Sequence, residues 1–175
     1  MSPVAANAAR VELLCLDVDG VMTDGGINLD DFGVETKRFH VRDGTGIRLW
    51  TRLGYQVAII TGRGGGALRH RAAELGISNI VQGSNDKAAA FEALLKKLAL
   101  STSQAAILAD DLPDLPVMRR AGYPMAVADA VPEVLNAAAY VTTLPGGAGA
   151  VREAIEHLLK ARDRWEEARS LFAQP

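Results

Sequence analysis

The stretch Leu13-Leu14-Cys15-Leu16-Asp17-Val18-Asp19-Gly20-Val21-Met22-Thr23-Asp24-Gly25 decides the fold of this chain. It continues an apolar run from Val11 that only Glu12 interrupts, which is typical of a strand buried on both faces. The run ends in Asp17 and Asp19, whose side chains point the same way from an extended chain. Carboxylates are costly at the end of a buried strand unless a cation meets them there. Because parallel α/β sheets bind ligands at the carboxyl ends of their strands, the stretch predicts a functional site, although a polar turn with a helix-capping aspartate would look similar.

Composition places the chain among ordinary globular proteins. Of its 175 residues, 49% are hydrophobic and 23% are charged, so we expect one domain over residues 1–175 with a substantial core. The formal net charge of −2 gives no electrostatic argument for binding nucleic acid or an anionic membrane. No apolar run is long enough to span a membrane, and we expect a cytoplasmic location. Residues 1–10 are expected to be flexible.

Strand patterns alternate with helix patterns along most of the chain. Short apolar strands are expected at 11–16, 55–60, 79–82, 104–108, 124–128 and 140–142. Helices are expected at 47–53, 67–75, 87–98 and 115–121, from about 131 behind an Asp129 cap, and from about 150. This order predicts a Rossmann-like α/β fold, in which a mostly parallel sheet carries helices on both faces.

The segment from Ile27 to His40 does not fit this alternation. Ile27 and Leu29 alternate with polar neighbours, as does the part around Val34, and Asp31-Phe32-Gly33 between them is a turn signal. The pattern predicts a β-hairpin. An isolated hairpin is only marginally stable in water, so we expect it to pack on its own domain or on another subunit.

Three predicted strands end in residues that can carry chemistry, and a lysine opens a helix between the second and the third. The residues are Asp17 and Asp19, then Thr61, Gly62 and Arg63, then Asp110, Asp111 and Asp114, with Lys87 as the lysine. Clustered carboxylates repel one another unless a cation is bound, and such oxygen ligands suit Mg²⁺. A lysine and a hydroxyl are natural partners of phosphoryl oxygens. The pattern therefore predicts phosphoryl transfer through a nucleophilic carboxylate.

The order of these residues resembles a known superfamily. Asp17-Val18-Asp19-Gly20, Thr61, Lys87 and Asp110-x-x-x-Asp114 look like the four motifs of the haloacid dehalogenase superfamily of phosphatases. The resemblance spans nearly the whole chain. One departure is Ala109, where the fourth motif usually has glycine, and this change removes no ligand.

The resemblance implies a role for each of these residues. Asp17 would attack phosphorus to form an aspartyl-phosphate, and Asp19 would protonate the leaving oxygen and then activate water. Thr61 and Lys87 would hold the phosphoryl oxygens. The implied Mg²⁺ ligands are the Asp17 side chain, the backbone carbonyl of Asp19 and Asp110, with Asp111 or Asp114 in support.

A closer resemblance is to the family of 3-deoxy-D-manno-octulosonate 8-phosphate (Kdo 8-phosphate) phosphatases. It rests on Thr23-Asp24-Gly25, Phe39-x-x-x-Asp43-Gly44-x-Gly46-Ile47, Ile60-Thr61-Gly62-Arg63, Gln82-Gly83-x-x-x-Lys87, Asp110-Asp111-Leu112-Pro113-Asp114-Leu115-Pro116 and Gly146-Gly147-x-Gly149-Ala150-Val151-Arg152-Glu153. The family implies a phosphorylated keto-sugar acid as substrate and a place in lipopolysaccharide synthesis. Arg63, with Gly62 beside it and Arg71 in support, is expected to bind the substrate carboxylate. The sequence departs from the family pattern at Gly64-Gly65-Gly66, which replaces a more polar stretch.

The chain has no room for a cap domain, either between Asp19 and the next helix or between Lys87 and Asp110. An uncapped site would be open to water, and the resemblance implies a homotetramer in which hairpins and C-terminal tails of neighbouring subunits close the site. The alternatives are a phosphatase of a nine-carbon keto-acid phosphate, of the N-acylneuraminate 9-phosphate type, and a non-catalytic assembly domain. The intact set of catalytic residue types argues against the second alternative, and the missing cap argues against a phosphomutase.

Overall fold

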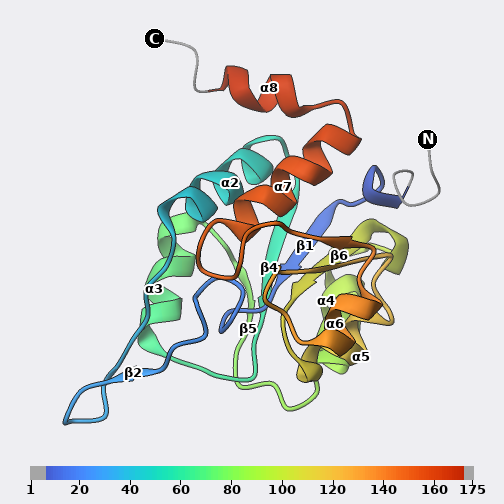
Figure 1. Ribbon diagram of the computed structural model, residues 1–175. Coiled ribbons are helices and arrows are strands. Elements are labelled where there is room, and N and C mark those ends of the chain that lie inside the picture. Colours follow the sequence, from blue (N-terminus) through green and yellow to red (C-terminus); the bar gives the residue numbers. More distant parts are fainter. Residues whose placement is uncertain (1–6, 172–175) are drawn as a thin grey trace.

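The computed structural model describes residues 7–171, and its centre is a six-stranded parallel sheet (Figure 1). The strands lie in the order β5-β4-β1-β6-β7-β8. Their bounds are β1 Leu13–Leu16, β4 Gln56–Ile60, β5 Asn79–Val81, β6 Ala105–Ala109, β7 Tyr123–Ala126 and β8 Tyr140–Val141. All six lie within two residues of the ranges that the sequence predicts.

Helices cover both faces of the sheet (Figure 1). On one face, α2 (Val41–Arg52) packs against α7 (Ala150–Ala161) and against α3 (Gly66–Leu75). On the other face, α5 (Leu115–Met118) packs between α4 (Lys87–Leu98) and α6 (Pro132–Ala137). The short helix α8 (Trp165–Ser170) follows α7 at the carboxyl end of the described chain. The predicted α/β architecture is therefore confirmed.

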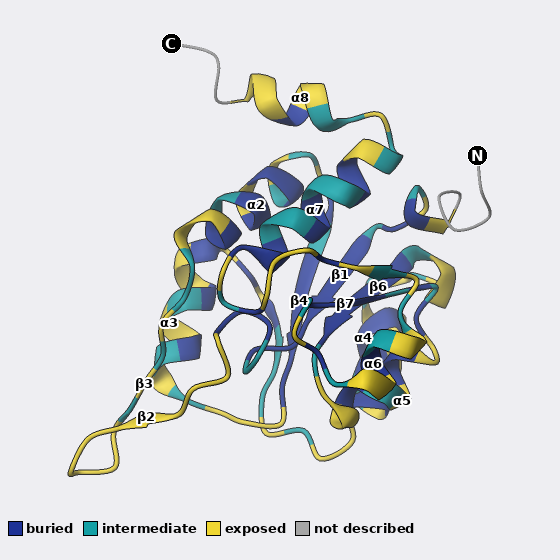
Figure 2. Cartoon of the chain, in the orientation of Figure 1, coloured by how far each residue is buried: buried dark blue, intermediate teal, exposed yellow. Residues whose placement is uncertain are grey.

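The core is the sheet together with the inner faces of these helices (Figure 2). All four residues of β1 and all five of β6 are buried, as expected for strands with a helix layer on each side. Trp50 of α2 is fully buried, and its indole N–H donates to the Gln56 carbonyl at 2.9 Å. Within residues 7–171, no helix is long and apolar enough to cross a membrane.

The strand order places a topological switch point between β1 and β6. From β1 the chain moves outward to β4 and β5, and it then returns to β6 and moves the other way to β7 and β8. Leu16, the last residue of β1, pairs with Leu108 of β6. Asp17 and Asp110 follow directly after these two strands, at the position where open α/β sheets bind ligands.

Three local predictions are wrong. Residues 43–46, expected to precede the first helix at 47–53, lie inside α2, where Gly44 and Gly46 allow close helix packing. A Cβ at Gly46 would lie 3.1 Å from the Arg152 Cα of α7. The helix expected over 115–121 ends at Met118. Asp129 does not cap α6, since its carboxylate accepts the Gly146 N–H at 2.9 Å.

The segment expected to be flexible divides into two parts. Residues 1–6 lie outside the described residues. Residues 7–10 form a turn in which the Arg10 N–H donates to the Asn7 carbonyl at 3.1 Å, and Ala8 is fully buried. Burial of Ala8 in the core explains why this second part is ordered.

The predicted hairpin is confirmed. Strands β2 (Asn28–Leu29) and β3 (Glu35–Thr36) pair antiparallel and project from the body of the molecule (Figure 1). Its apolar side chains are exposed, with Phe32 91% accessible and Ile27, Leu29 and Val34 each more than half accessible. Among residues 7–171, these side chains therefore form an exposed apolar surface on the hairpin.

A loop of glycines supports the loop that follows β1. We call residues 17–25 the aspartate loop and residues 144–149 the glycine loop. The Gly147 N–H donates to the Val21 carbonyl at 3.0 Å, and a Cβ on Gly146 would lie 1.7 Å from the Gly20 carbonyl oxygen. The glycine loop therefore packs directly on the aspartate loop, and only glycine permits that distance at residue 146.

Candidate active site

Asp17 stands at the end of β1 and anchors the site. Its backbone N–H donates to the Leu108 carbonyl of β6 at 3.3 Å, which ties it to the neighbouring strand. The residue is 6% exposed. Burial and the neighbouring Asp114 carboxylate raise the Asp17 pKa, although Lys87 opposes this shift.

Lys87 lies between two of the carboxylates. Its Nζ is 2.8 Å from Asp17 Oδ1 and 2.7 Å from Asp114 Oδ1. The side chain begins α4, where Asp86 caps the helix by accepting the Ala89 N–H at 2.9 Å. A lysine in the first turn opposes the helix dipole, and the two buried carboxylates compensate for this placement.

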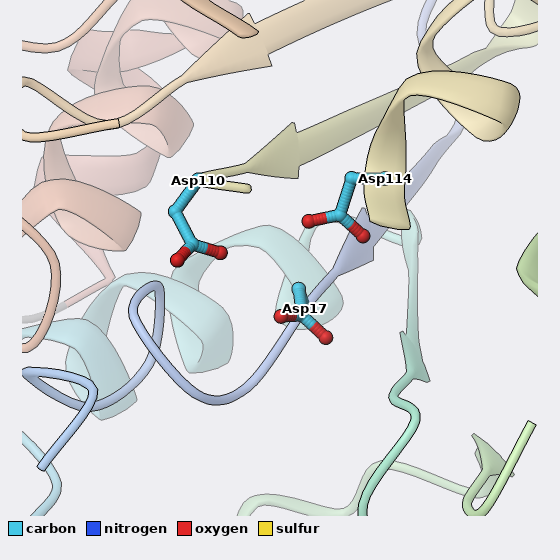
Figure 3. Close-up of side chains that lie close together, drawn as sticks. All are labelled: Asp17, Asp110 and Asp114. Carbon is cyan, nitrogen blue, oxygen red and sulfur yellow. The ribbon is translucent and has the colours of Figure 1, made fainter. Parts of the chain in front are cut away.

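Asp110 and Asp114 complete a group of three carboxylates with Asp17. Their side chains converge from the ends of β1 and β6 and from the turn after β6 (Figure 3). One oxygen of each lies within 4.8 Å of the others. Asp110 Oδ1 and Asp114 Oδ2 are buried without a hydrogen-bond partner among the described residues. Unpaired carboxylate oxygens at this spacing fit a hard divalent cation such as Mg²⁺.

The raised pKa values of the three carboxylates also favour a bound cation. Burial, followed by repulsion from Asp17 and Asp114, raises the Asp110 pKa to about 7. Asp114 also has a raised pKa, mainly because it is buried. One ammonium group is insufficient to keep these three closely spaced carboxylates ionised at neutral pH, and a bound cation would supply the missing positive charge.

The glycine after Asp19 is required by this arrangement. Gly20 has φ of +91°, and a Cβ there would lie 2.0 Å from Asp110 Oδ2. Thr23 closes the same loop, since its Oγ1 accepts the Gly20 N–H at 3.4 Å and donates to the Val18 carbonyl at 3.3 Å. The aspartate loop thus places its backbone against the Asp110 carboxylate.

A cavity of about 220 Å³ opens onto the carboxylates. It is lined by Asp17, Asp19, Thr61, Gly62, Arg63, Lys87, Asp110, Asp111, Pro113 and Asp114. Thr61 is 2% exposed and follows β4, where its Oγ1 accepts the Arg63 N–H at 3.2 Å. Asp111 is exposed and caps the turn after β6 by accepting the Leu112 N–H at 2.7 Å, so Asp114 is the supporting carboxylate that joins the group.

The structure separates the two arginines expected to bind substrate. Arg63 borders the cavity and pairs with Glu35 at 2.8 Å, with its Nε 3.6 Å from Asp19 Oδ2. Arg71 lines a different pocket of about 410 Å³ with Lys37 and pairs with Glu74 at 2.8 Å.

Sequence reasoning missed two residues of the hairpin. Lys37 forms an ion pair with Asp19 and lies 3.2 Å from Glu35, which itself binds Arg63. The Lys37 side chain is 3% exposed although it comes from an otherwise exposed hairpin. The only sequence signal was the mixed charge of Glu35-Thr36-Lys37-Arg38, which reads equally well as a solvated strand.

Comparisons with known proteins agree with this geometry. The family profile of haloacid dehalogenase-like hydrolases matches residues 72–155. The 3-deoxy-D-manno-octulosonate 8-phosphate phosphatase of Escherichia coli K12 is 47% identical over 95% of this chain and 88% of its own length.

Solved structures of the same enzyme are also similar. That from Yersinia pestis has a TM-score of 0.92 at 47% identity, covering 94% of this chain and 89% of its own. That from Moraxella catarrhalis, in complex with magnesium, phosphate and Kdo, has a TM-score of 0.95 at 41% identity, covering 98% and 99%.

The raised Asp110 pKa predicts how pH and Mg²⁺ affect stability. An unfolded aspartate titrates near pH ~3.9, whereas folded Asp110 titrates at about 7, so this group's contribution to stability is lost as pH rises between these values. We expect the melting temperature of the metal-free protein, relative to that of Asp110→Asn, to fall by several degrees from pH 5 to pH 8.

Calorimetry at the two pH values, with and without Mg²⁺, checks this expectation. Mg²⁺ binds ionised carboxylates, so the stabilisation that it gives should be larger at pH 8 than at pH 5. An equal Mg²⁺ effect at both values, or a wild-type protein that follows Asp110→Asn at every pH, would contradict the assignment.

Proposed function

The chain belongs to the family of Kdo 8-phosphate phosphatases, and from this we propose that it hydrolyses Kdo 8-phosphate to Kdo and phosphate with Mg²⁺ as cofactor. It is thus a phosphoric monoester hydrolase. The observation that carries the proposal is the group of Asp17, Asp110 and Asp114 around Lys87 at the switch point of the sheet. The Moraxella catarrhalis relative, which binds magnesium, phosphate and Kdo, supports the same reaction.

We propose that Asp17 is the nucleophile. Its carboxylate attacks phosphorus, forming an aspartyl-phosphate as the bond to the sugar oxygen breaks. Asp19 gives its proton to that oxygen and later takes a proton from the water that attacks the intermediate, which frees phosphate and restores Asp17. Both residues line the same cavity, and Asp17 is fixed between β6 and Lys87.

The remaining cavity residues bind and orient the phosphoryl group in this proposal. Lys87 and the Thr61 hydroxyl hold its oxygens, with Lys87 also fixing the attacking carboxylate. Asp17, Asp110 and the Asp19 backbone carbonyl would hold Mg²⁺, supported by Asp114. The cation neutralises negative charge on the phosphoryl group when bound.

Substrate selection is proposed to involve the arginines. Arg63 with Gly62 stands at the cavity mouth, and Arg71 lies in the pocket of about 410 Å³ that Lys37 also lines. A guanidinium suits the planar carboxylate of a keto-sugar acid. Glu35 pairs with Arg63, and Glu74 pairs with Arg71. A substrate carboxylate would compete with these two side chains for the guanidinium groups.

We further propose that the chain acts as one uncapped domain in a homotetramer whose hairpins cover neighbouring sites. The support is the exposed apolar hairpin and an active-site cavity over which residues 7–171 place no second domain. A cytoplasmic location and a role in lipopolysaccharide synthesis, where Kdo is consumed, complete the proposal.

Phosphate release from a panel of substrates tests the function. With Mg²⁺, we expect kcat/KM for Kdo 8-phosphate to exceed that for N-acetylneuraminate 9-phosphate and p-nitrophenyl phosphate by at least about tenfold, the effect of a 1.4 kcal/mol preference. Chelation by EDTA should abolish turnover of all three. Equal rates on all three would contradict the substrate, and a preference for the nine-carbon substrate would identify the alternative family function.

Sedimentation of a hairpin variant tests the assembly. Phe32→Asp adds a charge to the most exposed apolar side chain of the hairpin, so we expect the tetramer to dissociate at concentrations where the wild type stays assembled. Asp31→Asn, one residue away at the same turn, is the control and should sediment as the wild type does. A wild-type monomer that still selects Kdo 8-phosphate would contradict the proposed closure.

A further inference from the structure

Lys37 is the most buried charged side chain of the hairpin. It is 3% exposed, whereas the adjacent Arg38 is 79% exposed and reaches outward to Asp24. Burying an ammonium group is costly unless carboxylates and hydrogen bonds compensate. Asp19 and Glu35 supply this compensation, so the structure holds Lys37 at one position.

The contact with Lys37 makes the two oxygens of Asp19 unequal. Asp19 Oδ1 accepts a hydrogen bond from Lys37 Nζ. Asp19 Oδ2 is buried without a hydrogen-bond partner among residues 7–171, and its closest cation is Arg63 Nε at 3.6 Å. The Arg63 side chain is 47% exposed and is therefore the less constrained of the two cations. Lys37 thus binds one oxygen of Asp19, and the other oxygen has no hydrogen-bond partner among the described residues.

We propose that Lys37 is a positioning residue that holds Asp19 with Oδ2 free to carry the transferred proton. The inference rests on the proposed function, because it assumes that Asp19 is the general acid and base. Lys37 binds Oδ1 and orients the carboxylate, and Asp19 Oδ2 gives its proton to the sugar oxygen as the bond to phosphorus breaks. Glu35 supports the arrangement by binding both Lys37 and Arg63.

The contacts of Lys37 with Asp19 and Glu35 support a positioning role. An ammonium group has three donors, and Asp19 and Glu35 use two of them. The hairpin therefore has a second role besides subunit contact, since it carries the side chain that orders the catalytic carboxylate. Lys37 lies in the segment between β1 and α2, outside the four motifs. Its role therefore has no signal in the sequence pattern.

The dependence on leaving group tests the proposal. An alkoxide such as the Kdo 8-oxygen needs a proton in order to leave, whereas p-nitrophenolate does not. We expect Lys37→Met to lower kcat/KM for Kdo 8-phosphate by at least about tenfold, within the range that general acids contribute, and to change kcat/KM for p-nitrophenyl phosphate by less than about threefold. Lys37→Arg should restore most of the activity on Kdo 8-phosphate.

Arg38→Met is the matched control, because Arg38 is a neighbouring cation of the same hairpin that pairs outside the cavity. Arg38→Met should change kcat/KM for either substrate by no more than about twofold, within the roughly ±0.5 kcal/mol typical of surface substitutions. Circular dichroism and the melting temperature of each variant identify any loss of activity that comes from misfolding. If Lys37→Met misfolds, Lys37→Arg tests the proposal with the positive charge retained.

A double-mutant cycle with Asp19→Asn distinguishes positioning from substrate binding. If Lys37 acts through Asp19, then Lys37→Met should cause no further loss on Kdo 8-phosphate once Asp19 is asparagine. Additive losses, or equal losses on the two substrates, would overturn the proposal while leaving the phosphatase function intact. Full activity of Asp19→Asn on Kdo 8-phosphate would instead overturn the proposed function.

Discussion

Repulsion among three carboxylates, two of them buried and one partly buried, is the constraint on which the rest of this structure depends. Asp17, Asp110 and Asp114 place an oxygen each within 4.8 Å of the others, and Lys87 is the ammonium group that touches two of them. Asp17 follows β1 and Asp110 follows β6, and these two neighbouring parallel strands are fully buried. The rigidity of the sheet therefore keeps charges together that would separate on a flexible scaffold, and it favours the binding of a divalent cation and a phosphoryl group.

Support for the aspartate loop comes from segments distant in sequence. Gly20 turns with a positive φ directly against Asp110, and the glycine loop packs on the other side. Asp129 holds that second loop by accepting the Gly146 N–H. Glu153 of α7 holds its beginning by accepting the Leu144 N–H at 3.0 Å. The positions of the three carboxylates thus depend on the whole sheet edge from β1 to α7.

Much of this could be predicted from the sequence because local chemistry and global fold agree. Asp17, Thr61 and Asp110 directly follow buried strands, and the parallel topology brings these strand ends to one edge. Two features had no local signal. Gly44 and Gly46 look like a loop, since nothing in their neighbourhood shows that α3 packs against Gly44 and α7 against Gly46. Lys37 looks like a solvated strand residue, because its burial depends on how the hairpin folds back over Asp19.

The central claim is that Asp17 forms the covalent intermediate and that Asp19 moves protons. Asp19→Asn should still accept phosphate from p-nitrophenyl phosphate, whose leaving group needs no proton, but should hydrolyse the intermediate slowly. The most direct measurement is rapid-quench kinetics of this variant with Mg²⁺, followed by peptide mass spectrometry. The account predicts a burst of about one p-nitrophenol per subunit and a phosphate on the peptide that contains Asp17. Equal, linear release of p-nitrophenol and phosphate with no phosphorylated peptide, or a phosphate on another residue, would contradict it.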